Sequence, residues 1–196
     1  FQQDVNVLWD LAPHDFSIIN YLFDDEPIDI EANGYSHLNS HISSSRSHLP
    51  DVVYLTVHFA SDIIAHFNMS WMSPVKVRRV AIGGTNKMLV WDDLNPSEKI
   101  KIYNCGISYQ QQESRNKLMP QYRIGDIFSP KVSNQEALQG VIEHFAQVIY
   151  KRETPLMDGT EGLRVVRMLE AAQASLDKTM QRIIQKREKH ECLNVS

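Results

Sequence analysis

Asp10 and His14 are the residues whose types and spacing first suggest chemistry. They lie four residues apart in the stretch 9–15, which runs into an apolar-periodic segment over residues 16–23. Pro13 suits the first position of a helix, where its missing N–H costs no hydrogen bond. The sequence therefore predicts that a helix begins at Pro13, with the carboxylate of Asp10 and the imidazole of His14 close to its N-terminus.

A helix start at Pro13 would place His14 and Asp15 in the first turn. The negative charge of Asp15 suits the positive end of the helix dipole, and the same dipole disfavours protonation of His14. A neutral imidazole can accept a proton, as a general base must. On the local pattern alone, residues that cap and pack a helix start are the commoner interpretation.

The remaining chain predicts strands first and helices last. Alternating apolar and polar residues, with many β-branched and aromatic ones, predict strands at 28–35, 51–59, 63–71, 76–82, 88–91 and 99–103. A long irregular loop is expected over 105–135, and a loop of that length is often functional. Apolar residues at helical spacing then predict helices over 135–151 and from Gly162 to about Lys189.

This order of elements predicts the α+β class. Strands joined by short turns indicate an open, mainly antiparallel sheet of about six strands, and helices grouped at the two ends of the chain would cover one face of it. We expect one domain over residues 1–190 and a tail over 191–196. The other sheet face would carry Tyr54, His66 and Trp91, and it would be either an oligomer interface or a solvated face.

Composition excludes several classes of protein. The 196 residues are 42% hydrophobic and 22% charged, with a formal net charge of −4 and scattered basic residues, which does not suggest a nucleic-acid-binding protein. No apolar run approaches the ~20 residues of a membrane span, and no signal-peptide pattern opens the chain. Cys105 and Cys192 lie far apart and make no disulfide framework, so we expect reduced thiols and a cytoplasmic protein.

Other site types have weaker support. No glycine-rich loop for phosphate binding follows a strand, and Cys105 has no evident histidine partner for nucleophilic catalysis. His37, His41 and His48 lie on a Ser-rich loop without the tight ligand spacing that marks a metal site. A surface loop is the expected interpretation, and no metal is predicted. The basic residues 186–190 are expected to form a solvated helix end.

Several motifs occur in an order that resembles the C-terminal domain of the glucose–fructose oxidoreductase / inositol dehydrogenase (Gfo/Idh/MocA) family. The resemblance extends from about Leu8 to Ser175. The matching segments are 10–15, 65–71 with 74–78, 82–85, 122–126 and 158–162. In that family an N-terminal Rossmann domain binds NAD(P), and the C-terminal open-sheet domain shapes a sugar or cyclitol pocket and pairs subunits.

The resemblance implies roles for individual residues. The family's Asp-x-x-x-His motif falls on Asp10 and His14. His14 would assist loss of the hydroxyl proton while hydride leaves the carbinol carbon, and Asp10 would orient the imidazole or bind a substrate hydroxyl. Tyr122, Arg123 and Asp126 would border the pocket.

Two further basic residues are candidates for substrate binding with open alternatives. Lys76 and Arg78 follow the strand that ends at Trp71, and surface charges on a strand are the other interpretation. Arg123 could clasp a phosphate or a carboxylate with both of its terminal nitrogens, or it could form a structural ion pair with Asp126.

The Rossmann domain and the family's Glu-Lys-Pro segment, whose lysine assists catalysis, are absent from this sequence. We therefore expect that the chain alone neither binds NAD or NADP nor turns over substrate, and that it is either part of a longer enzyme or has lost catalysis. The main hypothesis is the substrate domain of a sugar, nucleotide-sugar or cyclitol dehydrogenase. The alternative is a non-catalytic module that self-associates or binds partners through the open sheet, and a metal-dependent hydrolase using the histidine loop is poorly supported.

Overall fold

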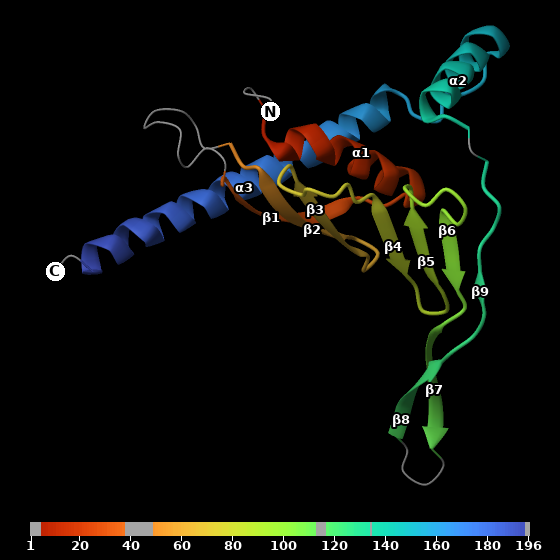
Figure 1. Cartoon of the computed structure of the whole chain (residues 1–196), viewed down its shortest axis with the longest axis horizontal. Coiled ribbons are helices and arrows are strands. Elements are labelled where there is room, and N and C mark those ends of the chain that lie inside the picture. The colour runs from red at the N-terminus through yellow and green to blue at the C-terminus, as the bar shows by residue number, and fades with distance from the viewer. Residues whose placement is uncertain (1–4, 38–48, 113–116, 134, 195–196) are drawn as a thin grey trace. The chain divides into compact units, whose positions relative to one another are not determined.

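The computed structural model describes residues 5–37, 49–112, 117–133 and 135–194 (Figure 1). The chain divides into two compact units, one formed by Phe1–Pro74 with Thr154–Ser196 and the other by Val75–Glu153. Each unit is described by itself. The prediction of one domain over residues 1–190 stays a prediction.

The first unit consists of one three-stranded sheet and two helices. Its elements are α1 (Val7–Leu22), β1 (Pro27–Tyr35), β2 (Val52–Phe59), β3 (Ile64–Ser70) and α3 (Gly159–Asn194). The strands pair antiparallel in the order β1-β2-β3, with Ala32 opposite Leu55 and Leu55 opposite Phe67. The predicted ranges of these strands agree with the structure to within one or two residues.

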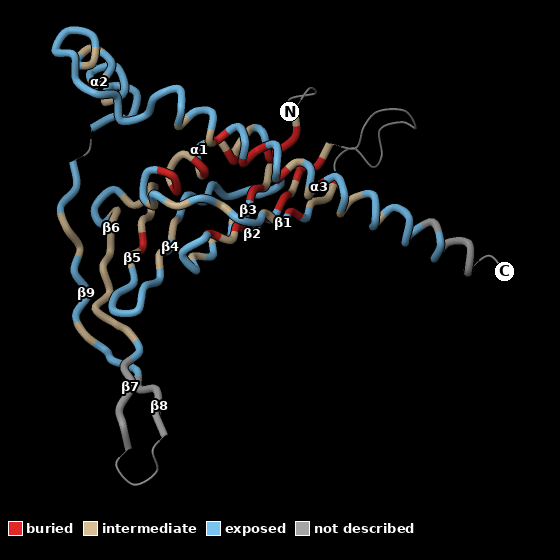
Figure 2. Tube along the Cα trace, turned by 180° about the vertical axis from the view of Figure 1, so that it is seen from behind, coloured by how far each residue is buried: buried red, intermediate tan, exposed pale blue. Residues whose placement is uncertain are grey.

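Apolar side chains of α1, the sheet and α3 form the core of this unit. Alternate residues of β2 point inward, as a strand with one buried face requires. Figure 2 shows buried segments in α1, in the first sheet and in α3. The members of the core include Leu8, Ala12, Phe16, Ala32, Val53, Leu55, Val57, Phe59, Met69, Met168, Leu169, Ala172 and Leu176. Both helices thus cover one face of the sheet, and the predicted α+β class is confirmed.

The predicted helix start at Pro13 is wrong. The helix begins at Val7, and the side chain of the N-cap Asn6 accepts a hydrogen bond from the backbone N–H of Trp9. Pro13 lies inside the helix, where it removes one backbone hydrogen bond. Burial of Val7, Leu8 and other apolar residues on both sides of the proline offsets that cost.

This correction changes the setting of the two candidate residues. Asp10 lies in the first turn, whereas His14 lies in the third. The effect of the helix dipole falls off within the first turn, so it does not extend to His14. Asp15, which the sequence placed in the first turn, also lies beyond it.

The second unit contains two further sheets and one helix. Strands β4 (Arg79–Gly83), β5 (Met88–Asp92), β6 (Ile100–Tyr103) and β9 (Ile127–Phe128) form one antiparallel sheet, and β7 (Gly106–Gln112) pairs with β8 (Lys117–Arg123) in another. Helix α2 (Ala137–Lys151) contains no buried residue.

The expected irregular loop over 105–135 is therefore wrong in part, because it contains β7, β8 and β9. The consecutive glutamines at 110–112 and Pro120 obscure the apolar–polar alternation by which strands are recognised. The hairpin is defined by antiparallel pairing of the β7 and β8 backbones. The strands of the described chain are also divided among three sheets and do not form one.

Gly34 lies in a close contact between β1 and α3. A Cβ at this position would lie 2.8 Å from Leu176 Cδ1 and 3.0 Å from both Val52 O and Val53 Cγ2. Distances this short leave no room for a methyl group in a close-packed core.

We expect Gly34→Ala to lower the free energy of unfolding by about 1–3 kcal/mol, because it overpacks this contact. Chemical denaturation of the whole chain measures the change. Gly162→Ala is the matched control, since a Cβ there meets nothing within 4 Å and alanine favours a helix. Equal stability of the two variants would contradict the assigned contact.

Asp25 fixes the turn between β2 and β3. Its Oδ2 accepts hydrogen bonds from the backbone N–H of Ser61, at 3.0 Å, and from the Ser61 hydroxyl. These bonds, the hydroxyl's first, lower the pKa of Asp25 below its ordinary value of 3.8. Asp25 therefore stabilises the folded state above about pH 3.8, and this stabilisation is lost as the pH falls through the lowered pKa.

Ser61→Ala should raise the pKa of Asp25 toward 3.8, because the hydroxyl donor is removed. A carboxyl-carbon NMR titration measures this pKa directly. Ser70→Ala is the control, since the Ser70 hydroxyl accepts a local bond from the Met72 N–H and does not contact Asp25 in the described residues. A pKa of Asp25 that is the same in both variants would show that Ser61 is not its partner.

Candidate functional site

Asp10 and His14 lie on the same side of α1. Residues four apart in a helix are neighbours on one face, and this face is opposite the one that buries Leu8, Ala12 and Phe16. His14 is exposed, and Asp10 is half-buried. The carboxylate and the imidazole are thus presented on the same side of the helix, away from Leu8, Ala12 and Phe16.

Trp71 covers the carboxylate of Asp10. It follows the last residue of β3, and its indole Nε1–H donates to Asp10 Oδ2 at 2.8 Å. The indole is half-buried and packs against the core cluster. The sequence indicated only that Trp71 ends a strand, because no local pattern pairs residues 61 positions apart.

The first turn of α1 is tied to α3 through Gln173. Its Oε1 accepts from Asn6 Nδ2 at 2.8 Å and from Trp9 Nε1 at 3.0 Å. Its Nε2 donates to Asp177 Oδ1 at 2.8 Å. The amide is therefore held at both ends, which fixes the helix turn that carries Asp10. The sequence did not single out Gln173, since this contact also spans the chain.

The arrangement can support acid–base chemistry on a hydroxylated molecule. The carboxylate of Asp10 can accept a hydrogen bond from a hydroxyl group, and the exposed imidazole of His14 can exchange a proton with one. The structure thus places the two predicted catalytic residues together and adds Trp71 as a hydrogen-bond partner of one of them.

The five predicted substrate-binding residues all lie in the second unit. Tyr122 is 84% exposed, and Lys76 and Asp126 are exposed as well. Arg78 is exposed, and its Nη1 lies 3.5 Å from Asp93 Oδ2. The backbone carbonyl of Asp126 accepts from the N–H of Asn104 at 2.9 Å.

Arg123 is engaged in contacts that close the base of the β7–β8 hairpin. Its Nη1 donates to Asn104 Oδ1 at 2.8 Å and to Asn104 O at 3.3 Å, and its Nη2 donates to the carbonyl of Asn86. The guanidinium thus bonds to loop carbonyls and an amide, where the sequence suggested either a substrate anion or Asp126 as its partner.

The histidine loop offers no metal site in the described residues. His37 Nδ1 lies 2.9 Å from Asp51 Oδ1, and the backbone N–H of His37 donates to Asp51 Oδ2 at 2.7 Å. Asp51 is only 2% exposed, so these bonds compensate its burial. The other two histidines of the loop, His41 and His48, lie outside the described residues. Across the described ranges no group of three or more metal-binding side chains occurs.

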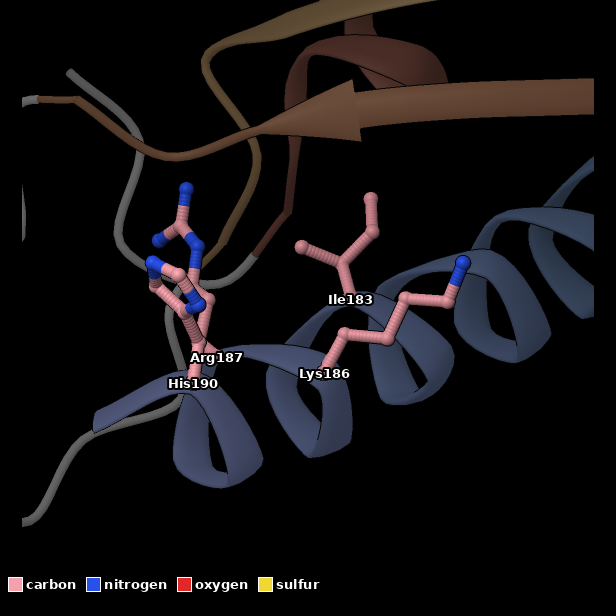
Figure 3. A pocket seen from close by; sticks show the side chains of 4 residues that line it. All are labelled: Ile183, Lys186, Arg187 and His190. Carbon is pink, nitrogen blue, oxygen red and sulfur yellow. The ribbon is translucent and has the colours of Figure 1, made fainter. Parts of the chain in front are cut away.

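A shallow hollow lies on the C-terminal half of α3 (Figure 3). Ile183, Lys186, Arg187 and His190 line it. The Arg187 guanidinium lies 4.7 Å above the centre of the Tyr35 ring, and its Nη1 donates to the Tyr35 hydroxyl. Arg187 therefore joins the helix to the end of β1, in the segment that the sequence predicted to be a solvated helix end.

Comparison with known families matches the first part of the chain. The model of the GFO/IDH/MocA C-terminal domain matches residues 2–90, which include α1 and the first sheet. The predicted resemblance is confirmed, and the Asp10–His14 pair lies within the matched GFO/IDH/MocA segment.

Several solved structures share the fold of this chain. UDP-N-acetylglucosamine 3-dehydrogenase GnnA from Acidithiobacillus ferrooxidans is similar with a TM-score of 0.67 and 18% identity, over 90% of this chain and 48% of that one. An NAD binding oxidoreductase from Klebsiella pneumoniae has a TM-score of 0.65 and 16% identity, over 91% and 50%.

Aldose-aldose oxidoreductase from Caulobacter crescentus has a TM-score of 0.64 and 15% identity, over 89% of this chain and 46% of that one. The chain thus spans about half the length of the solved structures that it matches. At these identities the likeness establishes the fold. No curated protein matches the sequence. Among the described helices, none has the length and apolar character to cross a membrane.

Proposed function

We propose that this chain is the substrate domain of an NAD(P)-dependent oxidoreductase that acts on a hydroxyl or carbonyl group of a sugar, nucleotide-sugar or cyclitol. The observation that carries the proposal is the Asp10–His14 pair on one exposed side of α1, within a GFO/IDH/MocA C-terminal domain. The names of two similar structures, a UDP-N-acetylglucosamine dehydrogenase and an aldose-aldose oxidoreductase, support a sugar as the substrate class.

In this proposal the dinucleotide is not bound by the described strands. Every strand pairing in the described residues is antiparallel, whereas the Rossmann site lies at the crossover between parallel strands. NAD or NADP, which would accept the hydride when bound, therefore belongs to another domain in this proposal. The chain would contribute the residues on the substrate side.

In this role His14 takes the proton from the reacting hydroxyl of the substrate. Its exposed imidazole can reach a bound polyol and pass the proton to water. Asp10 binds a substrate hydroxyl through Oδ1, because Oδ2 accepts from Trp71. The predicted contacts of Lys76, Arg78, Tyr122 and Asp126 with a sugar or its phosphate stay predictions, and these side chains are exposed in the second unit.

We expect His14→Ala in the full-length enzyme to lower kcat by about 10²- to 10⁴-fold, the usual range for loss of a general base. Production of NADH or NADPH is followed with glucose, myo-inositol and UDP-N-acetylglucosamine as probe substrates. His66→Ala is the matched control, since His66 is exposed on the outer face of the first sheet and contacts Thr56. Unchanged kcat in His14→Ala would refute the catalytic role.

Self-association through an open sheet is our second proposal, because the sheet β4-β5-β6-β9 has an apolar face. Register places Val80, Trp91 and Ile100 side by side in one row across the strands. A second row on the same face contains Ile82, Leu89, Ile102 and Phe128. Helix α2 of this unit has no buried residue, so it does not cover these rows. A second copy of the chain is the proposed partner.

Of the outward residues predicted from the sequence, only Trp91 belongs to this apolar face. Tyr54 and His66 lie in the first sheet, where their neighbours Thr56 and Asn68 are polar. A face with such neighbours is suited to solvent, whereas contiguous apolar rows are typical of a protein interface. This contrast also favours the alternative function, a non-catalytic oligomerisation module, if the enzyme tests fail.

Trp91→Lys should shift a self-associated chain toward the monomer, because it places a charge in the apolar rows. Sedimentation velocity of the whole chain over a range of concentrations measures the shift. Tyr54→Lys, a similar change on the polar outer face of the first sheet, is the control. A wild-type chain that stays monomeric at high concentration would overturn this proposal.

A further inference from the structure

We propose that Trp71 is a positioning residue for the reaction: its indole N–H holds Asp10 Oδ2, so that Oδ1 is presented to a substrate hydroxyl. The inference rests on the proposed function, because it assigns a role to a partner of Asp10. It adds a residue that lies on a different element, at the end of β3, and far from Asp10 in the sequence.

The hydrogen bond between Trp71 and Asp10 has the geometry of a strong contact. The distance from Nε1 to Oδ2 is 2.8 Å, and both side chains are half-buried. Hydrogen bonds to charged acceptors are shorter and stronger than neutral ones, and partial burial reduces the competition from water. The bond can therefore restrict the rotation of the carboxylate.

The indole is itself attached to a fixed part of the fold. The backbone N–H of Trp71 donates to the carbonyl of Asp51 at 3.0 Å. Asp51 is buried, and its carboxylate accepts both the backbone N–H and the ring Nδ1 of His37. Trp71 is thus held through its backbone by Asp51, the residue before β2, and through its ring by the core cluster.

The chemistry of the donor sets which oxygen remains for the substrate. An indole N–H can only donate, so Trp71 occupies one carboxylate oxygen and leaves the other as an acceptor. A sugar hydroxyl is a suitable donor for that oxygen. His14 lies one turn further along the same side of α1, where it can act on a neighbouring hydroxyl of the same molecule.

Trp71→Phe in the full-length enzyme is the first test, because phenylalanine keeps an aromatic ring and removes the N–H. We expect kcat/KM for the active probe substrate to fall about tenfold, which is typical of losing a hydrogen bond to a charged group. Tyr54→Phe is the control: it also keeps an aromatic ring and removes one polar hydrogen, but on the outer face of the first sheet, and kcat/KM should change less than twofold.

A double-mutant cycle separates positioning from general destabilisation. If Trp71 acts through Asp10, Trp71→Phe should have no further effect on kcat/KM once Asp10 is alanine. A tenfold additional loss in the Asp10→Ala background would overturn the proposal. Full activity of Asp10→Ala would instead refute the proposed function of Asp10, whatever Trp71→Phe does, so the two failures are distinguishable.

An NMR measurement on the chain of 196 residues tests the bond without turnover. In ¹⁵N–¹H spectra the indole resonance of Trp71 should shift in Asp10→Ala, while the resonance of Trp9 stays in place. Dispersed backbone resonances in the same spectra report that the variant is folded. An unshifted Trp71 indole resonance in a folded Asp10→Ala chain would overturn the proposed contact.

Discussion

Burial of one apolar side of α1 between the first sheet and α3 is the constraint on which the site depends. Phe16 is fully buried and meets Phe67 of β3 edge-on, with ring centres 5.4 Å apart and planes at 86°. This orientation is favourable for aromatic rings. Because the buried side of α1 is fixed in this way, the opposite side, with Asp10 and His14, is fixed as well.

Burial of the apolar side of α1 also explains why this helix continues through Pro13, where local sequence rules predict a helix start. Pro13 costs about 3 kcal/mol inside a helix, which is comparable to the gain from burying one or two large apolar side chains. The helix has Val7, Leu8 and Ala12 buried before the proline and Phe16 and Ile19 buried after it. Packing against the sheet thus decides the course of the backbone, and the proline is tolerated.

Much of the first unit could be predicted because its strands show strict alternation. In β2 the buried Val53, Leu55 and Val57 alternate with more exposed residues, so both the strand and its inward face followed from the sequence. The start of α1 could not be predicted in this way. Asn6 is recognised as the N-cap only by the hydrogen bond that it accepts from the Trp9 N–H, and Pro13 suggested a later start. Strands β7 and β8 show little alternation, because three consecutive glutamines end β7 and Pro120 lies within β8.

The sequence was sufficient to predict the residues of the candidate site. It was not sufficient to predict which side chains contact them. Asp10 and His14 stand four residues apart, a spacing that needs no tertiary information. Their surroundings do need it: Trp71 and Gln173 reach α1 from β3 and α3, across long stretches of sequence. For Arg123, residue type suggested an anion as partner, whereas loop carbonyls satisfy the guanidinium.

The division of the first unit into two separate stretches has a consequence for how it folds. Residues up to Pro74 supply α1 and the sheet, but α3 arrives only after Val75–Glu153 has been made. During synthesis the apolar face of β1 therefore stays uncovered until Leu176 and its neighbours have been made. The entropic cost of closing such a loop grows only slowly with its length. The second unit is thus an insertion whose size could vary with little effect on the stability of the unit that contains Asp10 and His14.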